Sequence, residues 1–352
     1  MRPLVILALL AALPAAAVEG SVSAEVTIGK QFALNVNGEI SPVEDRLWFV
    51  LGYGLLKSPD IPATDTVPKI TTSANHLFSL GVDVSPHKSW TFSLNGQVSP
   101  RSYESVPLNP MAPLVERLTL STSRQTAGSS LSIVFDSAGD SAFEWGVDTG
   151  FGFTWNRMGV ALSRGAFIRL REEELLQDDL WTMRPSLGLS AIIADRVTLS
   201  VRGGYSFYSD DPLTVGRLDP DDLTVVQRAV AERLAQLVLL SQEATDAVLA
   251  RLSTFDALSG YPYAPVRLDL KGAVQVKFVR SFALQLSWTY LRYVPTQGFG
   301  NVAALKASFH LGDNWRAWII AALQLDATND APASKADWLW TGHLSVGGEF
   351  GF

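Results

Sequence analysis

The sequence predicts an all-β fold, an antiparallel up-and-down barrel that spans a membrane, and three observations lead to this prediction. Apolar residues recur at every second position in many segments of the 352-residue chain. Short turns between these segments alternate with long polar connections. Beyond the first 17 residues no apolar run approaches the roughly 18 residues of a membrane helix, although 47% of the chain is hydrophobic. This combination is typical of strands that face lipid on one side and a wet lumen on the other.

Residues 1–17, MRPLVILALLAALPAAA, are expected to form a cleaved secretory signal peptide. Arg2 precedes a short apolar run, and small residues precede the expected cleavage point after Ala17. The run is too short to span a bilayer. Residues 18–352 are then the mature protein and form the barrel. A retained N-terminal anchor is the alternative.

Sixteen segments carry the alternating pattern and are expected to be the strands. They are residues 22–28, 32–40, 47–55, 78–84, 90–98, 114–122, 131–135, 143–155, 160–170, 187–193, 197–207, 266–278, 282–290, 305–311, 315–325 and 344–352. An even number is what a closed barrel with both ends on one side requires. Fourteen or eighteen strands are the alternatives.

The connections differ in length in an ordered way. The short ones are SPVED (41–45), SPHKS (85–89), NRM (156–158), ADR (194–196), RS (280–281) and GDN (312–314). The long ones are residues 57–74, 100–112, 171–184, 210–264 and 327–337. Short turns on one side and long loops on the other are typical of bacterial barrels whose short turns face the periplasm.

Aromatic residues of the apolar parity fall near strand ends. Trp90, Trp155 and Trp315 are expected at the short-turn end, and Tyr205 and Trp288 near the other rim. Two aromatic girdles follow, because amphipathic rings prefer the level of the lipid headgroups.

The chain ends in LSVGGEFGF, where Val346, Gly348, Phe350 and Phe352 share one parity. These four positions resemble the C-terminal signal of bacterial outer-membrane β-barrels, in which apolar positions lie two, four and six residues before a final aromatic. The resemblance is to this class and to no single family, and the architecture is similar to that of porins. It implies a Gram-negative outer membrane, contact with its lipid and lipopolysaccharide, and recognition by the barrel-assembly machinery.

Charged residues on the opposite parity are expected to line the lumen. The basic ones are Arg169, Arg202, Arg267, Lys271, Lys277, Lys306 and Arg316. The acidic ones are Glu25, Glu39, Asp83, Glu144 and Asp148. We call the seven basic residues the basic arc. In a wet lumen the basic arc would attract anionic solutes. The alternative is a filled lumen in which these charges pair.

The longest connection contains a second kind of pattern. Residues 219–257 are expected to form an amphipathic helix, or a bent pair, in the extracellular loop between the eleventh and twelfth strands. Asp219 suits the N-cap, and Pro220 suits the first helical position. Apolar residues then recur at helical spacing, among them Leu234, Leu237, Val248 and Leu252. The helix is expected to cap, gate or constrict the barrel mouth, or to dock a partner.

Other function classes have little support in the sequence. The absence of cysteine excludes disulfides, thiolate metal sites and cysteine nucleophiles. A formal net charge of −7 argues against a nucleic-acid partner. His343 and Ser345 share a strand face but make a weak catalytic pair. Neither an enzymatic activity nor a metal or cofactor site is expected.

The sequence therefore predicts an outer-membrane channel or transporter that passes small solutes, with anions as one candidate class, through a charged lumen. The alternative is a non-conducting barrel that serves as a scaffold in an envelope, adhesion or polysaccharide-export complex and docks a partner protein through the helical insert.

Overall fold

The computed structural model describes most of the strands and short turns of the chain. The described residues are 19–29, 32–43, 46–57, 71–72, 74–107, 118–137, 142–164, 171–210, 266–294, 299–312, 314–327 and 338–352. The expected signal peptide (1–17) and the expected helical insert (219–257, with Leu234, Leu237, Val248 and Leu252) lie outside these residues, as does Arg169.

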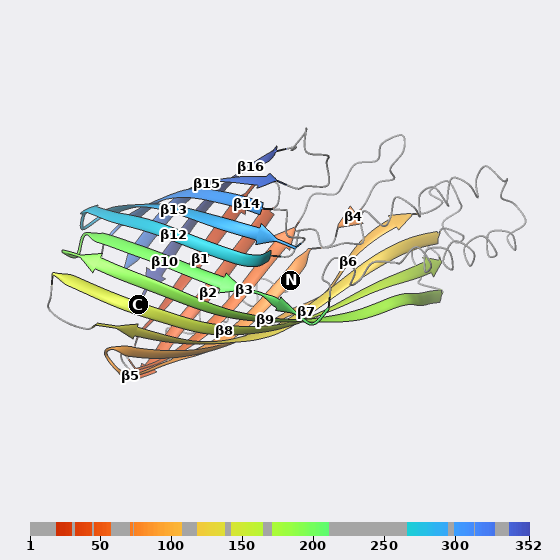
Figure 1. Ribbon diagram of the computed structural model, residues 1–352, viewed down its shortest axis with the longest axis horizontal. Coiled ribbons are helices and arrows are strands. Elements are labelled where there is room, and N and C mark those ends of the chain that lie inside the picture. The colour runs from red at the N-terminus through yellow and green to blue at the C-terminus, as the bar shows by residue number, and fades with distance from the viewer. Residues whose placement is uncertain are drawn as a thin grey trace, which may run out of the picture.

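The described residues form one antiparallel β-barrel (Figure 1). Its strands are β1 (Glu19–Ile28), β2 (Phe32–Val43), β3 (Leu47–Lys57), β4 (Thr71–Thr72), β5 (Asn75–His87), β6 (Trp90–Pro107), β7 (Leu118–Asp136), β8 (Phe143–Arg164), β9 (Arg171–Ile193), β10 (Val197–Tyr205), β11 (Phe207–Tyr208), β12 (Val266–Val279), β13 (Phe282–Tyr293), β14 (Phe299–His310), β15 (Trp315–Ala327) and β16 (Trp338–Gly351). In these parts of the chain, no helix has the length and apolar character needed to cross a bilayer.

Neighbouring strands pair in sequence order, and the sheet closes on itself. β1 pairs with β2 on one side and with the last strand, β16, on the other. β9 pairs with β10, which pairs with β12. β4 and β11 have two residues each. β4 pairs with β6 beyond the start of β5, and β11 pairs with β9 beyond the end of β10. The described wall therefore contains fourteen long strands, which satisfy their backbone hydrogen bonds around a closed ring.

The prediction of sixteen strands is wrong because two long strands were each counted as two. The described parts of the expected strands 114–122 and 131–135, residues 118–122 and 131–135, both belong to β7, and residues 143–155 and 160–164 both belong to β8. The two strands pair from Leu118 opposite Arg164 to Asp136 opposite Gly146. Polar residues and glycines interrupt the apolar alternation in the middle of both strands, although the hydrogen-bonded ladder continues through them.

Five of the six expected short turns are confirmed. They lie between β2 and β3, β5 and β6, β9 and β10, β12 and β13, and β14 and β15. The β9–β10 turn uses Ala194 and Asp195 at φ values of 49° and 55°, the left-handed conformation typical of a tight hairpin. The sixth, NRM (156–158), is wrong because these residues lie within β8.

One side of the wall is much taller than the other. β6, β7, β8 and β9 have 18, 19, 22 and 23 residues, whereas β1, β2 and β3 have 10, 12 and 11. A strand needs about 9–11 residues to cross a bilayer. The four long strands therefore extend past the rest of the barrel at the long-loop end (Figure 1). The expected loop at 171–184 is wrong, because these residues belong to β9, and residues 100–107 of the expected loop at 100–112 belong to β6.

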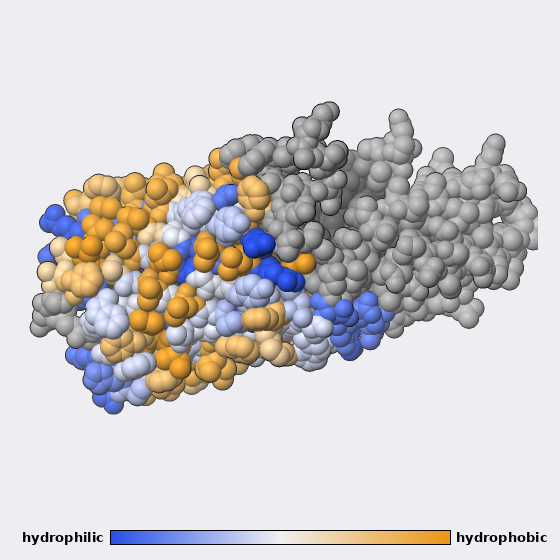
Figure 2. All heavy atoms as spheres, viewed as in Figure 1, coloured by the Kyte–Doolittle hydropathy of each residue, from blue (hydrophilic) through white to orange (hydrophobic). Residues whose placement is uncertain are grey.

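Hydrophobic residues cover much of the barrel face shown in Figure 2, with more polar residues between them. The residues Leu94, Val201 and Leu286 are 58%, 61% and 60% exposed. A soluble protein rarely exposes an apolar patch of this extent to water. At the short-turn end, the Trp90 ring centre lies 4.9 Å from that of Phe135. At the long-loop end, the Phe153 ring centre lies 4.9 Å from that of Trp181. Two aromatic girdles therefore flank the apolar band, as in outer-membrane barrels.

Trp155 was expected in the lower girdle and lies instead beside Trp181, with ring centres 6.2 Å apart. The error follows from the NRM segment, since a turn at residue 156 would have ended the strand there. Because β8 continues past Trp155 toward the long-loop end, Trp155 belongs to the girdle at that end.

The last strand forms the seam of the barrel. The Gly20 N–H donates to the Phe352 carbonyl over 3.0 Å, and the Phe352 N–H donates to the Gly20 carbonyl over 2.9 Å. The Phe350 ring packs against Trp315 on β15, with ring centres 4.8 Å apart. The terminal aromatic residues thus lie at the short-turn rim, where the first and last strands meet.

Candidate functional site in the barrel lumen

Three side-chain pairs cross over an intervening strand and identify the inner face of the wall. Arg202 on β10 lies 3.3 Å from Asp148 on β8, and Arg184 on β9 lies 2.6 Å from Asp269 on β12. The Trp318 indole on β15 donates from Nε1 to Glu25 Oε2 on β1 over 2.7 Å. Side chains two strands apart approach each other most closely on the concave side of a curved sheet. We call these three contacts the strand-bridging pairs.

A glycine lies on the crossed strand beneath each strand-bridging pair. A Cβ atom on Gly347 would lie 2.6 Å from Trp318 Nε1, and one on Gly204 would lie 2.9 Å from both Arg184 Nε and Asp269 Oδ1. The third glycine, Gly188, leaves more room, since its Cβ would lie 3.5 Å from Asp148 Oδ2. The bridging side chains therefore lie flat against the wall, and those over Gly347 and Gly204 would have to shift if these glycines carried a Cβ atom.

The basic residues expected in the lumen lie on the inner parity of their strands, Arg169 excepted because it is outside the described residues. Arg202 lies opposite Lys271 in the register of β10 and β12, and Arg267 and Lys277 share the Lys271 face. Lys306 on β14 places its Nζ 4.9 Å from the centre of the Trp318 ring. Arg316 on β15 lies 3.9 Å from Glu349 on β16. The basic arc thus contains both paired and separate cations.

The expected acidic residues also lie on the inner parity. Glu25 and Asp148 belong to strand-bridging pairs. Glu39 on β2 is opposite Val50 on β3, and Asp83 on β5 is opposite Trp48. Glu144 on β8 is opposite Ile192 on β9. Carboxylates therefore occur on both sides of the lumen.

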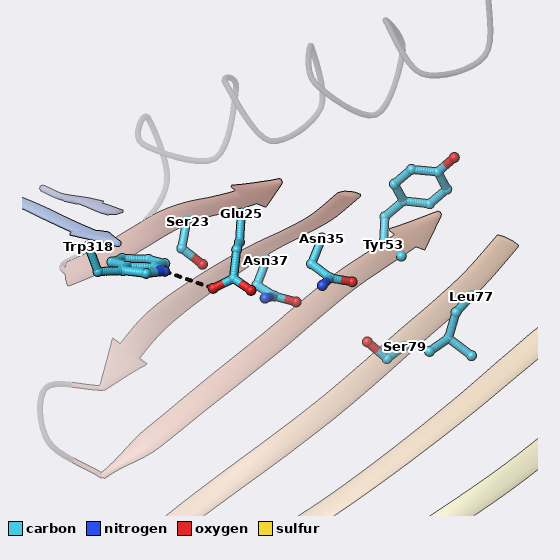
Figure 3. Close-up of a pocket in the computed structure, with 9 residues that line it drawn as sticks. Ser23, Glu25, Asn35, Asn37, Tyr53, Leu77, Ser79 and Trp318 are labelled. Carbon is cyan, nitrogen blue, oxygen red and sulfur yellow. Dashed lines mark hydrogen bonds between the residues drawn. The ribbon is translucent and has the colours of Figure 1, made fainter. Parts of the chain in front are cut away.

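A cavity of about 240 Å³ lies in the inner wall formed by β1, β2, β3 and β5 (Figure 3). Its lining includes Ser23, Glu25, Asn35, Asn37, Ser79 and Trp318. Figure 3 shows the Trp318 indole reaching toward the Glu25 carboxylate, with Asn37 and Asn35 on the next strand. Hydroxyl, amide and carboxylate groups thus meet a flat aromatic ring in one recess.

No protein-family model matches the chain, and no curated protein matches it. Among solved structures, the chain is similar to the CymD monoaromatic hydrocarbon channel, with 8% identity, 95% of this chain and 88% of that chain covered, and a TM-score of 0.52. It is also similar to the KdgM porin, with 9% identity, 94% and 99% covered, and a TM-score of 0.38. A third similar structure is the translocator domain of the autotransporter NalP from Neisseria meningitidis. The identity is 8%, the match covers 99% of this chain and 95% of that chain, and the TM-score is 0.41.

At such low identity the likeness to CymD concerns the fold alone, and it agrees with the closed wall, the apolar band and the two aromatic girdles. The chain folds as an outer-membrane β-barrel. Its place is the outer membrane of a Gram-negative bacterium, where the apolar band contacts lipid. In such barrels the short turns face the periplasm, and the extensions of β6–β9 then lie on the outside of the cell.

The barrel contains inner-wall residues that sequence reasoning missed. Arg184 was assigned to a loop because the upper part of β9 lacks apolar alternation. Trp318 lies on the polar parity of β15, between Arg316 and Ile320, and an aromatic residue at such a position was the available signal. Asp269 alternates along β12 with Arg267 and Lys271, but its partner is Arg184 on β9.

The weak catalytic pair suggested by the sequence is not brought together by a hydrogen bond. Ser345 Oγ lies 2.8 Å from Thr27 Oγ1 on β1, within hydrogen-bond distance. His343 lies beside Gly29. Among the described residues, no three histidine, aspartate or glutamate side chains lie where they could share a metal ion.

Proposed function

We propose that this barrel is an outer-membrane channel for small polar solutes, and that anions are favoured beside the basic arc on β10–β15. The observation that supports this most directly is the exposure of Arg202. Its side chain projects from the middle of β10 to the inner face and is 52% exposed although it is paired with Asp148. A lumen filled with protein would bury this guanidinium, so its exposure favours a water-filled passage.

The distribution of cations supports a preference for anions. Lys271 lies directly opposite Arg202 in the register of β10 and β12, and Lys306 lies on β14 of the same arc. Fixed charges in a narrow passage raise the local concentration of oppositely charged solutes. The carboxylates of Asp148, Asp269 and Glu349 lower this effect where they pair, so the separate lysines should contribute most.

Planar-bilayer recordings of the purified protein test the proposal. The wild type should give discrete conductance steps, and Arg202→Gln, Lys271→Gln and Lys306→Gln together should lower the anion-to-cation permeability ratio by about twofold or more. Arg157→Gln is the matched control, because Arg157 faces outward on β8 and pairs with Asp179 over 2.8 Å. A folded barrel that never conducts would contradict the proposal and favour the scaffold alternative.

Two further roles belong to the same proposal. Residues 219–257, as an amphipathic helix, would cap or gate the mouth of the channel, because their apolar stripe needs a surface against which to pack. The terminal positions Val346, Gly348, Phe350 and Phe352 would be recognised by the barrel-assembly machinery before β16 closes against β1.

A further inference from the structure

The cavity beside β1–β5 gathers several polar side chains that make no hydrogen bond to another described residue. Ser23, Asn35, Asn37 and Ser79 have no hydrogen-bond partner among the described residues of the protein. Asn156 on β8 differs from them, because its Oδ1 accepts from Thr126 Oγ1 over 2.9 Å. Polar groups that face water without a protein partner can bind a solute at little cost, since only water must be displaced. These four side chains therefore form a set of donors and acceptors available to a ligand.

Glycines on β3 shape the recess. A Cβ atom on Gly52 would lie 2.8 Å from Asn37 Oδ1, and one on Gly54 would lie 3.2 Å from Asn35 Oδ1. The two amides therefore lie close over the backbone of the neighbouring strand and leave open space above it. With larger side chains at residues 52 and 54, this space would be filled.

The Glu25 carboxylate is held in a fixed position at one end of the recess. Its Oε2 accepts the Trp318 indole N–H over 2.7 Å, and a hydrogen bond to a charged acceptor is stronger than a neutral one. Its Oε1 has no protein donor among the described residues. One carboxylate oxygen is thus anchored, and the other can accept from a solute.

The composition of the recess selects the ligand class. Its lining contains no lysine or arginine, and the neighbouring Lys306 contacts the Trp318 ring from outside the lining, so an anion inside the recess would meet the Glu25 carboxylate. An apolar ligand would leave the amides, hydroxyls and carboxylate unpaired. A sugar presents hydroxyl groups that both donate and accept, and its C–H groups can contact the Trp318 indole.

We propose that this recess is a binding subsite for one neutral sugar ring on the path of solutes through the barrel. The proposal rests on the channel function proposed above and names the solute class that this side of the lumen would take. The volume of about 240 Å³ is below the roughly 300–1,000 Å³ typical of sites for drug-sized ligands, which fits a single ring better than a whole oligosaccharide. Longer sugars would place one ring here and extend along the lumen.

Titration of single-channel current with neutral sugars tests the subsite. Glucose and maltose should reduce the wild-type current, with half-maximal effect at about 1–10 mM, as expected of a weak transit site. Asn35→Ala with Asn37→Ala should weaken this effect about tenfold, because two hydrogen bonds are lost. Glucuronate and glycine, as an anionic sugar and a zwitterion, should bind more weakly than glucose.

Asn95→Ala is the matched control. Asn95 is an inward asparagine on β6 that lies over Gly81, on the same wall but outside the recess. The control variant should keep the wild-type response to glucose. If it loses the response as strongly as the Asn35 and Asn37 variant, the recess is not the binding site. A stronger response to glucuronate than to glucose would overturn the assignment to neutral sugars.

Calorimetry separates failure of the subsite from failure of the channel. Glucose should bind to purified protein in a detergent without a sugar headgroup, and the double alanine variant should weaken binding by the same factor. A conducting barrel that binds no sugar by either method overturns the subsite and leaves the channel. A barrel that binds sugar in the recess but never conducts overturns the channel and leaves the subsite's ligand class.

Discussion

The two sides of the inner wall use polar side chains in different ways. On β8–β12, which we call the paired side, Asp148 contacts Arg202 and Arg184 contacts Asp269 across single strands. On β1, β2, β3 and β5, the unpaired side, Asn35, Asn37 and Ser79 have no protein partner among the described residues. Both sides are polar by sequence, and only the geometry distinguishes them.

The difference teaches which polar groups hold the wall and which remain available to solutes. An exposed ion pair adds little to stability, because water already solvates both ions and two long side chains lose freedom. On the paired side the ion pairs instead fix the position of each arginine, because the carboxylate holds the guanidinium along the wall and not across the lumen. On the unpaired side the groups are short and need no such restraint, so they keep their hydrogen-bonding capacity for a ligand.

Trp318 joins the two arrangements. Its indole crosses Gly347 to reach Glu25, as the arginines cross glycines on the paired side, yet the bond it makes shapes the recess on the unpaired side. The comparison of the paired and unpaired sides is therefore tested most directly at Gly347, whose lack of a side chain lets the Trp318 indole lie against the wall.

Gly347→Ala should have the largest effect of the changes that test this comparison. The added Cβ would overlap the Trp318 indole, which is held by its own strand and must leave the wall. A ring displaced into the lumen narrows the passage, so single-channel conductance should fall by about a factor of two. The response to glucose should fall as well, because Glu25 loses its anchor.

Gly188→Ala is the control for this change. Its Cβ would meet Asp148 Cβ at 3.4 Å and Arg202 Cγ at 3.5 Å, which are ordinary contact distances. Conductance of this variant should stay close to wild type. Equal losses in the two variants would mean that the space under the bridging side chains does not control the passage.

Much of the fold could be predicted from the sequence, and its main error has a physical cause. Strict alternation marks strands whose outer face meets lipid along their whole length, such as β12–β15. In β7 and β8 polar residues and glycines interrupt the period-two signal in mid-strand, between residues 122 and 131 and between residues 155 and 160. Hydrogen bonding along the ladder continues there, but no side-chain pattern records it.

The inner wall was less predictable because its contacts join residues that are far apart in sequence. Parity could put Glu25 on the polar face of its strand. It could not show that Trp318, 293 residues away, donates to this carboxylate, because that depends on the meeting of β1 with β16. Nor could it separate Asp148, which is paired across Gly188, from carboxylates without a cationic partner.

Asp148→Asn and Arg202→Gln should have intermediate and opposite effects on ion selectivity. Each removes one charge from the pair and leaves its partner uncompensated on the paired side. The first should raise the anion-to-cation permeability ratio and the second should lower it, each by about twofold or less. The double variant should return close to wild type in bilayer recordings. If both single variants shift selectivity in the same direction, the two side chains do not act as a pair.

The smallest effect is expected on stability, and a double-mutant cycle at Arg184 and Asp269 measures it. Arg184 Nη2 lies 2.6 Å from Asp269 Oδ1, but the arginine side chain is 48% exposed and the aspartate 16%, so water screens the pair. Urea unfolding in lipid vesicles of the two alanine variants and the double variant should give a coupling of about 0.5–1 kcal/mol. Arg316 and Glu349, 3.9 Å apart at the periplasmic end, should couple by less. A coupling above about 2 kcal/mol for Arg184 and Asp269 would mean that the pair is a stabilising element in its own right, which exposed pairs rarely are, and the view that pairing on this side is positional would be wrong.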